Sequence, residues 1–117
     1  MRNMPSFDTP DGIIEEFQRR LERDGLLSVA TVDINPTEGG GLSLDRIVVA
    51  EQQRGQGVAS RIVSVFVQLC DDYAQDAEVI PKPLDEQTSR EGLERLYARY
   101  GFVRVSANES LMRRQSS

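Results

Sequence analysis

The stretch that decides the fold of this chain runs from Ile47 to Ser60 and reads IVVAEQQRGQGVAS. Its opening residues are β-branched, which is typical of a strand. Its end begins a periodic apolar pattern that indicates a helix. Two glycines, Gly55 and Gly57, stand between these parts and permit the tight turn that joins them. The stretch therefore predicts a strand, a glycine turn and a helix in direct succession.

The helix that begins at Val58 carries the strongest periodic signal in the sequence. Its apolar residues recur at helical spacing and so share one face. They are Val58, Ile62, Val65, Phe66, Leu69, Cys70 and Tyr73. Because Cys70 is the only cysteine, it has no disulfide partner within the chain, and its place in the pattern predicts a core residue.

The residues before this stretch predict one helix and two strands. Pro10 suits the first turn of a helix, where its missing N–H is not needed, and Gly25 is a natural end for that helix. Residues 26–34 and 42–49 are rich in β-branched residues, which predicts two strands. The turn residues at 35–41 make the connection short, so we expect an antiparallel hairpin.

The residues that follow the helix beginning at Val58 predict a short strand, a helix and a closing hairpin. The strand covers 78–84, the helix covers 90–100 and ends at Gly101, and the hairpin pairs 102–105 with 110–114. The resulting order, α–β–β–α–β–α–β–β, indicates an α/β protein. We expect a mixed, mostly antiparallel sheet with a central βαβ crossover and helices on both faces.

Length and charge limit the functions that are open to the chain. The 117 residues fit one domain spanning 1–117, with loose ends at 1–7 and 115–117. No apolar run approaches the roughly 20 residues that cross a membrane, and no secretory signal opens the sequence. We therefore expect a cytoplasmic protein without a membrane partner. The net charge of −5 argues against nucleic acid as the main partner.

The sequence contains no histidine and a single cysteine. The usual acid–base group at neutral pH is therefore missing, and a single cysteine cannot form the cluster of ligands that holds zinc. We expect no metal site, and we expect any catalysis to use carboxylates, tyrosine, serine or main-chain groups.

The glycine turn is suited to hold a phosphate. The first N–H groups of a helix have no intrahelical partner, and the helix dipole places partial positive charge beside them. Arg54 could add a charge-assisted contact. Other nucleotide motifs are missing, because Ser60 stands where a dinucleotide fingerprint needs glycine and no Walker A lysine is present. By themselves, the two glycines fit a simple tight turn equally well.

Two motifs together resemble the GNAT (Gcn5-related N-acetyltransferase) superfamily. Residues 47–59 are similar to its acetyl-CoA motif, Gln/Arg-x-x-Gly-x-Gly/Ala after an aliphatic strand end. Residues 96–102, LYARYGF, are similar to its late motif, Leu/Phe-Tyr-x-x-x-Gly-Phe. A helix, a strand and a helix separate the two motifs, as in the family. The resemblance extends over roughly 26–117.

The resemblance implies transfer of an acetyl group from acetyl-CoA to a primary amine of a small molecule or a protein. In the family, the pantetheine arm pairs with the strand before the turn, and amides of the turn hold the pyrophosphate. The corresponding positions here are Ile47, Val48, Val49, Gln52, Arg54, Gly55, Gln56, Gly57, Val58, Ala59 and Ser60.

The resemblance also implies a catalytic role for Tyr97, which stands where the family places a general acid for the departing thiolate. Its other interpretation is a core aromatic residue. The attacking amine must first lose a proton, commonly to a carboxylate. The sequence offers Asp45, Glu78, Asp85 and Glu86, and each of them could equally be a solvated surface carboxylate.

The sequence departs from the family in two places. Arg90 stands where the family often has a cofactor-contacting asparagine, although an arginine could instead reach a phosphate. The N-terminal half lacks a first strand, so the acceptor site is either open or completed by a second copy in a homodimer. The alternative function is therefore a catalytically inactive GNAT-fold protein that binds CoA or a protein partner.

Pro81 and Pro83 lie two residues apart in the strand predicted at 78–84, so both missing N–H groups fall on one edge. We expect residues 81–83 to make few or no ladder bonds to the 42–49 strand, which leaves a cofactor slot beside Val49. The other interpretation is an edge strand, where proline prevents aggregation.

Overall fold

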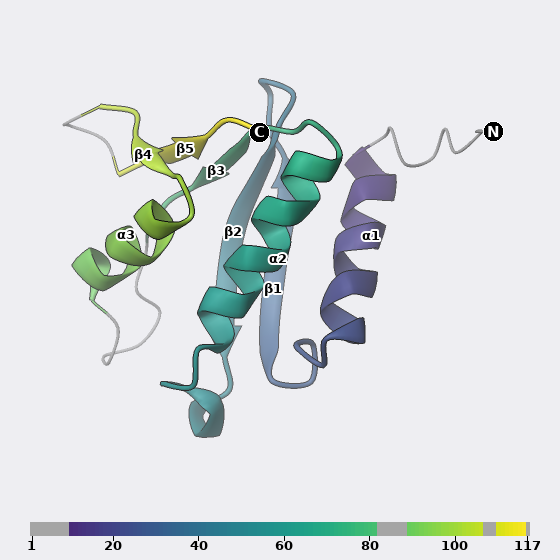
Figure 1. The fold of residues 1–117 in the computed structure, drawn as a ribbon, viewed down its shortest axis with the longest axis vertical. Coiled ribbons are helices and arrows are strands. Elements are labelled where there is room, and N and C mark those ends of the chain that lie inside the picture. Colours follow the sequence, from purple (N-terminus) through teal and green to yellow (C-terminus); the bar gives the residue numbers. More distant parts are fainter. Residues whose placement is uncertain (1–9, 82–88, 107–109, 117) are drawn as a thin grey trace.

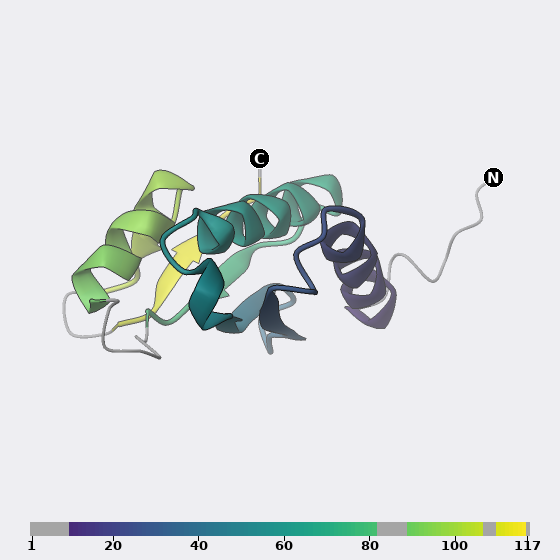
Figure 2. The ribbon, with the colours of Figure 1, turned by 90° about the horizontal axis from the view of Figure 1, so that it is seen from below.

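A five-stranded mixed sheet carries three helices on one of its faces (Figures 1 and 2). The computed structural model describes residues 10–81, 89–106 and 110–116. In chain order the elements are α1 (Pro10–Arg23), β1 (Ala30–Pro36), β2 (Leu42–Val49), the 3-10 turn η2 (Glu51–Gln53), α2 (Val58–Asp72), β3 (Ala77–Val79), α3 (Arg90–Arg99), β4 (Val103–Arg104) and β5 (Met112–Arg114).

The strands lie in the order β1-β2-β3-β5-β4. Only β2 and β3 pair in parallel, and α2 crosses over between them (Figure 1). This arrangement confirms the mixed, mostly antiparallel sheet with a central βαβ unit. The bounds of β2 and the start of α2 agree with the sequence prediction to the residue.

The predicted start of the first strand is wrong. Leu26 belongs to the cap that ends α1, residues 27–29 form a turn, and β1 begins only at Ala30. Gly25 has a φ of 74°, and the N–H of Leu26 donates to the carbonyl of Leu21 at 2.9 Å. This pattern is a Schellman cap, in which an apolar residue packs back onto the helix. Leu26 is 1% exposed for that reason, not because it belongs to a strand.

A bulge at Asp45 resets the alternation of β2. Ile34 of β1 pairs with Leu44, but the preceding residue of β1 pairs with Arg46, so Asp45 is the extra residue. As a result, Leu44 and Ile47 both face the helices although three positions separate them. The bulge turns apolar side chains toward the helices on both halves of the strand.

The expectation of helices on both faces is wrong for the described residues. All three helices lie on the same side of the sheet (Figure 2). The rings of Phe17 on α1 and Phe66 on α2 meet edge-on at 5.8 Å. The opposite face carries side chains such as Thr31, Asp33 and Ser43, and a polar sheet face of this kind can remain in contact with water.

The core lies between the sheet and the helices, and α2 supplies much of it. Cys70 is 0% exposed, which confirms it as a core residue. Val63 and Val67 are buried as well, although they lie off the predicted apolar face. Both are buried because α2 packs against α1 as well as against the sheet.

Candidate functional site

The parallel strands β2 and β3 separate soon after they begin to pair. Their pairing runs from Leu42 with Ala77 to Leu44 with Val79 and stops there. Pro81 lies beyond the end of β3, which confirms its predicted lack of pairing, whereas residues 82 and 83 lie outside the described residues. The second half of β2 therefore has β1 on one side and an opening on the other.

Two residues of β2 present main-chain groups to this opening. The N–H of Ala50 donates to the carbonyl of Val29 at 2.8 Å, which fixes the hydrogen-bonding phase of the β1–β2 ladder. In an antiparallel pair, every second residue bonds the partner and the residues between face the other way. Counted back from Ala50, Val48 is directed to β1, whereas Ile47 and Val49 face the opening.

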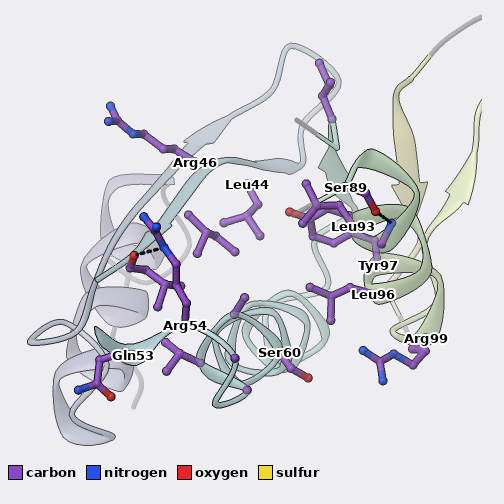
Figure 3. A pocket seen from close by; sticks show the side chains of 18 of the residues that line it. Leu44, Arg46, Gln53, Arg54, Ser60, Ser89, Leu93, Leu96, Tyr97 and Arg99 are labelled. Atoms are coloured by element: carbon purple, nitrogen blue, oxygen red, sulfur yellow. Dashed lines mark hydrogen bonds between the residues drawn. The ribbon is translucent and has the colours of Figure 1, made fainter. Parts of the chain in front are cut away.

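A cleft of about 630 Å³ occupies the opening (Figure 3). Its walls come from β2, the glycine turn, the first turn of α2, and α3. The apolar part of its lining comprises Leu44, Ile47, Val49, Val58, Ala59, Ile80, Leu93 and Leu96. A cleft of this size and lining is typical of a small-molecule or cofactor site.

The glycine turn brings the start of α2 to one end of the cleft. Gly55 and Gly57 have φ angles of 80° and 81°, a conformation that favours glycine. The first main-chain bond of the helix runs from the N–H of Arg61 to the carbonyl of Gly57 at 3.0 Å. The N–H groups of Val58, Ala59 and Ser60 precede that bond and are the donors that helix starts offer to anions.

Positive charge surrounds the cleft although the chain as a whole carries −5. Arg46, Arg54 and Arg99 line it, and Asp45 is the one acidic residue among its described lining. Arg54 is oriented by a 3.1 Å hydrogen bond from its Nε to the carbonyl of Val49. The lining therefore suits a ligand that is apolar along part of its length and anionic elsewhere.

Tyr97 is held by the cap that ends α3. Gly101 has a φ of 95°, and the N–H of Phe102 donates to the carbonyl of Tyr97 at 3.2 Å. Their rings meet edge-on with centroids 5.7 Å apart. The Tyr-x-x-x-Gly-Phe spacing is thus that of a Schellman cap with its apolar contact.

The hydroxyl of Tyr97 points from α3 into the cleft, toward β2 (Figure 3). The residue is 7% exposed, and within the described part of the chain its hydroxyl makes no hydrogen bond. Burial raises the pKa of Tyr97 to about 12, so the hydroxyl keeps its proton at neutral pH. Tyr97 is therefore a core residue that presents a protonated hydroxyl to the cleft.

Two of the four carboxylates named from the sequence lie among the described residues, and they lie in different places. Asp45 lines the cleft, and its carboxylate accepts hydrogen bonds from Nδ2 of Asn35 at 2.5 Å and Oγ of Ser43 at 2.6 Å. Glu78 lies outside the cleft and is ion-paired with Arg113 at 2.7 Å. Asp85 and Glu86 lie outside the described residues.

Of the predicted cofactor-binding residues, some line the cleft and others do not. Of the turn and helix-start residues, Arg54, Gly55, Gly57, Val58, Ala59 and Ser60 line the cleft, whereas Gln52 and Gln56 do not. Gln56 instead donates from Nε2 to the carbonyl of Gln52 at 3.2 Å. Arg90, the replacement for the family asparagine, contacts Glu94 and Ser110 away from the cleft.

Sequence reasoning missed several lining residues, chiefly Arg46, Gln53, Ile80, Ser89, Leu93, Leu96 and Arg99. Ser89 caps α3 by accepting a hydrogen bond from the N–H of Gly92 at 2.9 Å. Arg99 lies in the last turn of α3, where a basic residue is common because its charge complements the helix dipole. The sequence alone therefore offers no reason to place it at a ligand site. Its proximity to the α2 turn depends on tertiary packing.

No described helix has the length and apolar character needed to cross a membrane. Nor do three His, Cys, Asp or Glu side chains gather into a potential metal site anywhere in the described ranges.

Comparison with known proteins supports the fold. The sequence matches no protein-family model and no curated protein. The structure is similar to that of the anti-CRISPR protein AcrVA5, with a TM-score of 0.61 and 19% identity over 74% of this chain and 90% of the other. This likeness supports the mixed α/β fold of the chain.

Two further solved structures are more distantly similar, each with a TM-score of 0.43. One is a KacTA–DNA complex, with 18% identity, and the other is a variant of KacT, with 15% identity. Each comparison covers 74% of this chain, and 57% and 58% of the respective partner.

Proposed function

We propose that this protein is an N-acetyltransferase that binds acetyl-CoA in the cleft beside β2 and transfers the acetyl group to a primary amine. One observation carries the proposal. Where β2 leaves β3, an apolar cleft connects the glycine turn at the start of α2 with the hydroxyl of Tyr97. A ligand with a phosphate group at one end, a long neutral arm and a thioester at the other end matches this cleft. The phosphates would lie at the glycine turn and the thioester beside Tyr97.

The lining supports each part of such a ligand. Main-chain groups of Ile47 and Val49 face the opening, so they can pair with the amides of a pantetheine arm. The N–H groups at the start of α2 and the guanidinium of Arg54 can hold the pyrophosphate. The main-chain groups of Val48 face β1, and neither Gln52 nor Gln56 lines the cleft. We therefore assign these three residues no direct role in binding.

When bound, acetyl-CoA supplies a thioester whose carbonyl carbon a neutral amine attacks, so that a C–N bond forms while the C–S bond breaks. Tyr97 donates its proton or a hydrogen bond to the departing sulfur, because its hydroxyl remains protonated and faces the cleft. A main-chain N–H of β2 at Val49 stabilises the charge that develops on the carbonyl oxygen.

Asp45 is our candidate for the group that receives the proton of the amine. It is the one acidic residue of the described lining, and its carboxylate is held by Asn35 and by Ser43, a residue of the polar sheet face. Glu78 is not part of this proposal, because its ion pair with Arg113 lies away from the cleft.

A second function is supported by the small number of acidic residues in the described cleft, where Asp45 is the one candidate base. A protein with one hydrogen-bonded aspartate in its described cleft could bind CoA, or a protein partner, without turnover. The test is to incubate the protein with acetyl-CoA and a panel of primary amines and to follow free thiol, in parallel with thermal unfolding in the presence of CoA. Amine-dependent thiol release supports the enzyme, whereas a thermal shift without thiol release supports the binding protein.

A further inference from the structure

Arg99 is a cation at the cleft that pairs with no described residue. Neither Arg99 nor Arg95, one turn earlier on the same helix, has a hydrogen bond or ion pair within the described part of the chain. Most of the other described arginines are engaged, as in the pairs of Arg104 with Glu94 and Arg113 with Glu78. Of these two arginines on α3, Arg99 lines the cleft and Arg95 does not.

The position of Arg99 is fixed by its neighbour in the chain. The hydroxyl of Tyr100, at the end of α3, shares a 2.7 Å hydrogen bond with the hydroxyl of Ser60 in the first turn of α2. The carbonyl of Tyr100 accepts a 2.8 Å hydrogen bond from Nε of Arg114. Arg114 in turn binds Asp71 of α2 through bonds of 2.7 and 2.9 Å. The end of α3 is therefore tied to α2 at two points.

Two guanidinium groups consequently flank the start of α2 from different elements. Arg54 lies on the β2 side, and Arg99 reaches from α3 toward Ser60 on the other side (Figure 3). Asp45, the acidic residue of the described lining, belongs to β2, so it does not neutralise the α3 side. The two arginines can bind two separate anionic groups.

We propose that Arg99 binds a second phosphate of the ligand, separate from the pyrophosphate, and that this phosphate is the one on the ribose of CoA. The inference rests on the proposed function. The N–H groups of the helix start and Arg54 already supply donors for the pyrophosphate, whereas Arg99 stands on the opposite flank and donates to no described residue. A guanidinium binds a phosphate dianion through two parallel hydrogen bonds. The cleft thereby distinguishes CoA from dephospho-CoA, which lacks this phosphate.

The test is calorimetry at fixed ionic strength with CoA, dephospho-CoA and adenosine 3′,5′-bisphosphate, using the wild-type protein, Arg99→Gln and the matched control Arg95→Gln. We expect the wild type to bind CoA about tenfold more tightly than dephospho-CoA, the scale of one charge-assisted contact. Arg99→Gln should remove this preference without changing the affinity for dephospho-CoA. Arg95→Gln should keep the preference, although it loses the same charge from the same helix.

Equal wild-type affinity for CoA and dephospho-CoA overturns the inference, as does an Arg99→Gln variant that keeps the preference or weakens both ligands equally. If the bisphosphate binds in an Arg99-dependent manner while CoA does not bind, the phosphate subsite stands and the proposed acetyl transfer falls. If none of the three ligands binds, both proposals are overturned.

Discussion

The ring of Tyr97 meets the ring of Phe102 edge-on, with centroids 5.7 Å apart, across the cap that ends α3. This contact separates two contributions of Tyr97. The ring anchors the helix end, and the hydroxyl faces the cleft. Removing the hydroxyl alone therefore tests the chemistry without removing the packing.

Tyr97→Phe should lower turnover by roughly 10²-fold, within the range of a positioned acid, while leaving the affinity for acetyl-CoA nearly unchanged. Thiol release gives the rate, and calorimetry gives the affinity. Tyr73→Phe is the control, because Tyr73 lies at the end of α2 outside the cleft lining. A Tyr97→Phe variant with wild-type turnover would return Tyr97 to a purely structural role.

Asp45→Asn should lower turnover most strongly at neutral pH. An alkyl amine with a pKa of about 10 is mostly protonated at neutral pH and needs a base to remove its proton. At higher pH, a larger fraction of the amine is already neutral. The defect should therefore shrink as pH rises from about 7 to 9.5. Glu78→Gln serves as the comparison, because it removes a carboxylate outside the cleft. A defect of equal size at every pH would rule out Asp45 as the base.

The fold and the cleft were predictable to different extents from the sequence. The bounds of β2 and the start of α2 followed from a β-branched run and two glycines, which are local signals. The start of β1 was wrong because Leu26 looks like a strand residue but packs as part of a helix cap. Arg99 was missed as a lining residue because it reaches the α2 turn only through the packing of α3.

Ala74 offers a test of the local backbone. It is the one described non-glycine residue with positive φ, at 54°, and it ends α2 where the N–H of Gln75 donates to the carbonyl of Cys70. Because glycine adopts this conformation without steric cost, Ala74→Gly should stabilise the protein by up to about 1 kcal/mol. Ala98→Gly, in an exposed position within α3, should destabilise it by about 1 kcal/mol.

The free energy of unfolding, measured with urea, gives both values. Equal destabilisation by the two substitutions would contradict the assigned cap at Ala74.

Stability should fall at alkaline pH. Burial raises the pKa of the Cys70 thiol from 9.0 to about 12, and that of Tyr97 from 10.0 to about 12. The native state then holds these protons more tightly than the unfolded state does, so their contribution is complete below about pH 9 and is lost as the pH rises toward 12. Urea unfolding at a series of pH values measures this decline.

Cys70→Val removes one of the two groups and keeps an apolar side chain in the core. Its stability should decline less between pH 9 and 10 than that of the wild type. The native thiol should also resist thiol-specific reagents at neutral pH until the protein unfolds, because Cys70 is 0% exposed. Rapid labelling of the folded protein would contradict its placement in the core.

The central claim is that acetyl-CoA occupies the cleft at the glycine turn, and calorimetry of acetyl-CoA binding to the wild type, Gly57→Glu and Gly40→Glu tests it most directly. Gly57 and Gly40 have φ angles of 81° and 90°, and an added Cβ would meet nothing within 4 Å at either, so both variants carry a similar backbone strain and the same new charge. Only Gly57 lines the cleft. We predict that the wild type and Gly40→Glu bind acetyl-CoA alike and that Gly57→Glu binds at least about tenfold more weakly, because its carboxylate lies where the pyrophosphate must sit. A folded Gly57→Glu variant with wild-type affinity, or a wild type that does not bind acetyl-CoA, would contradict the account.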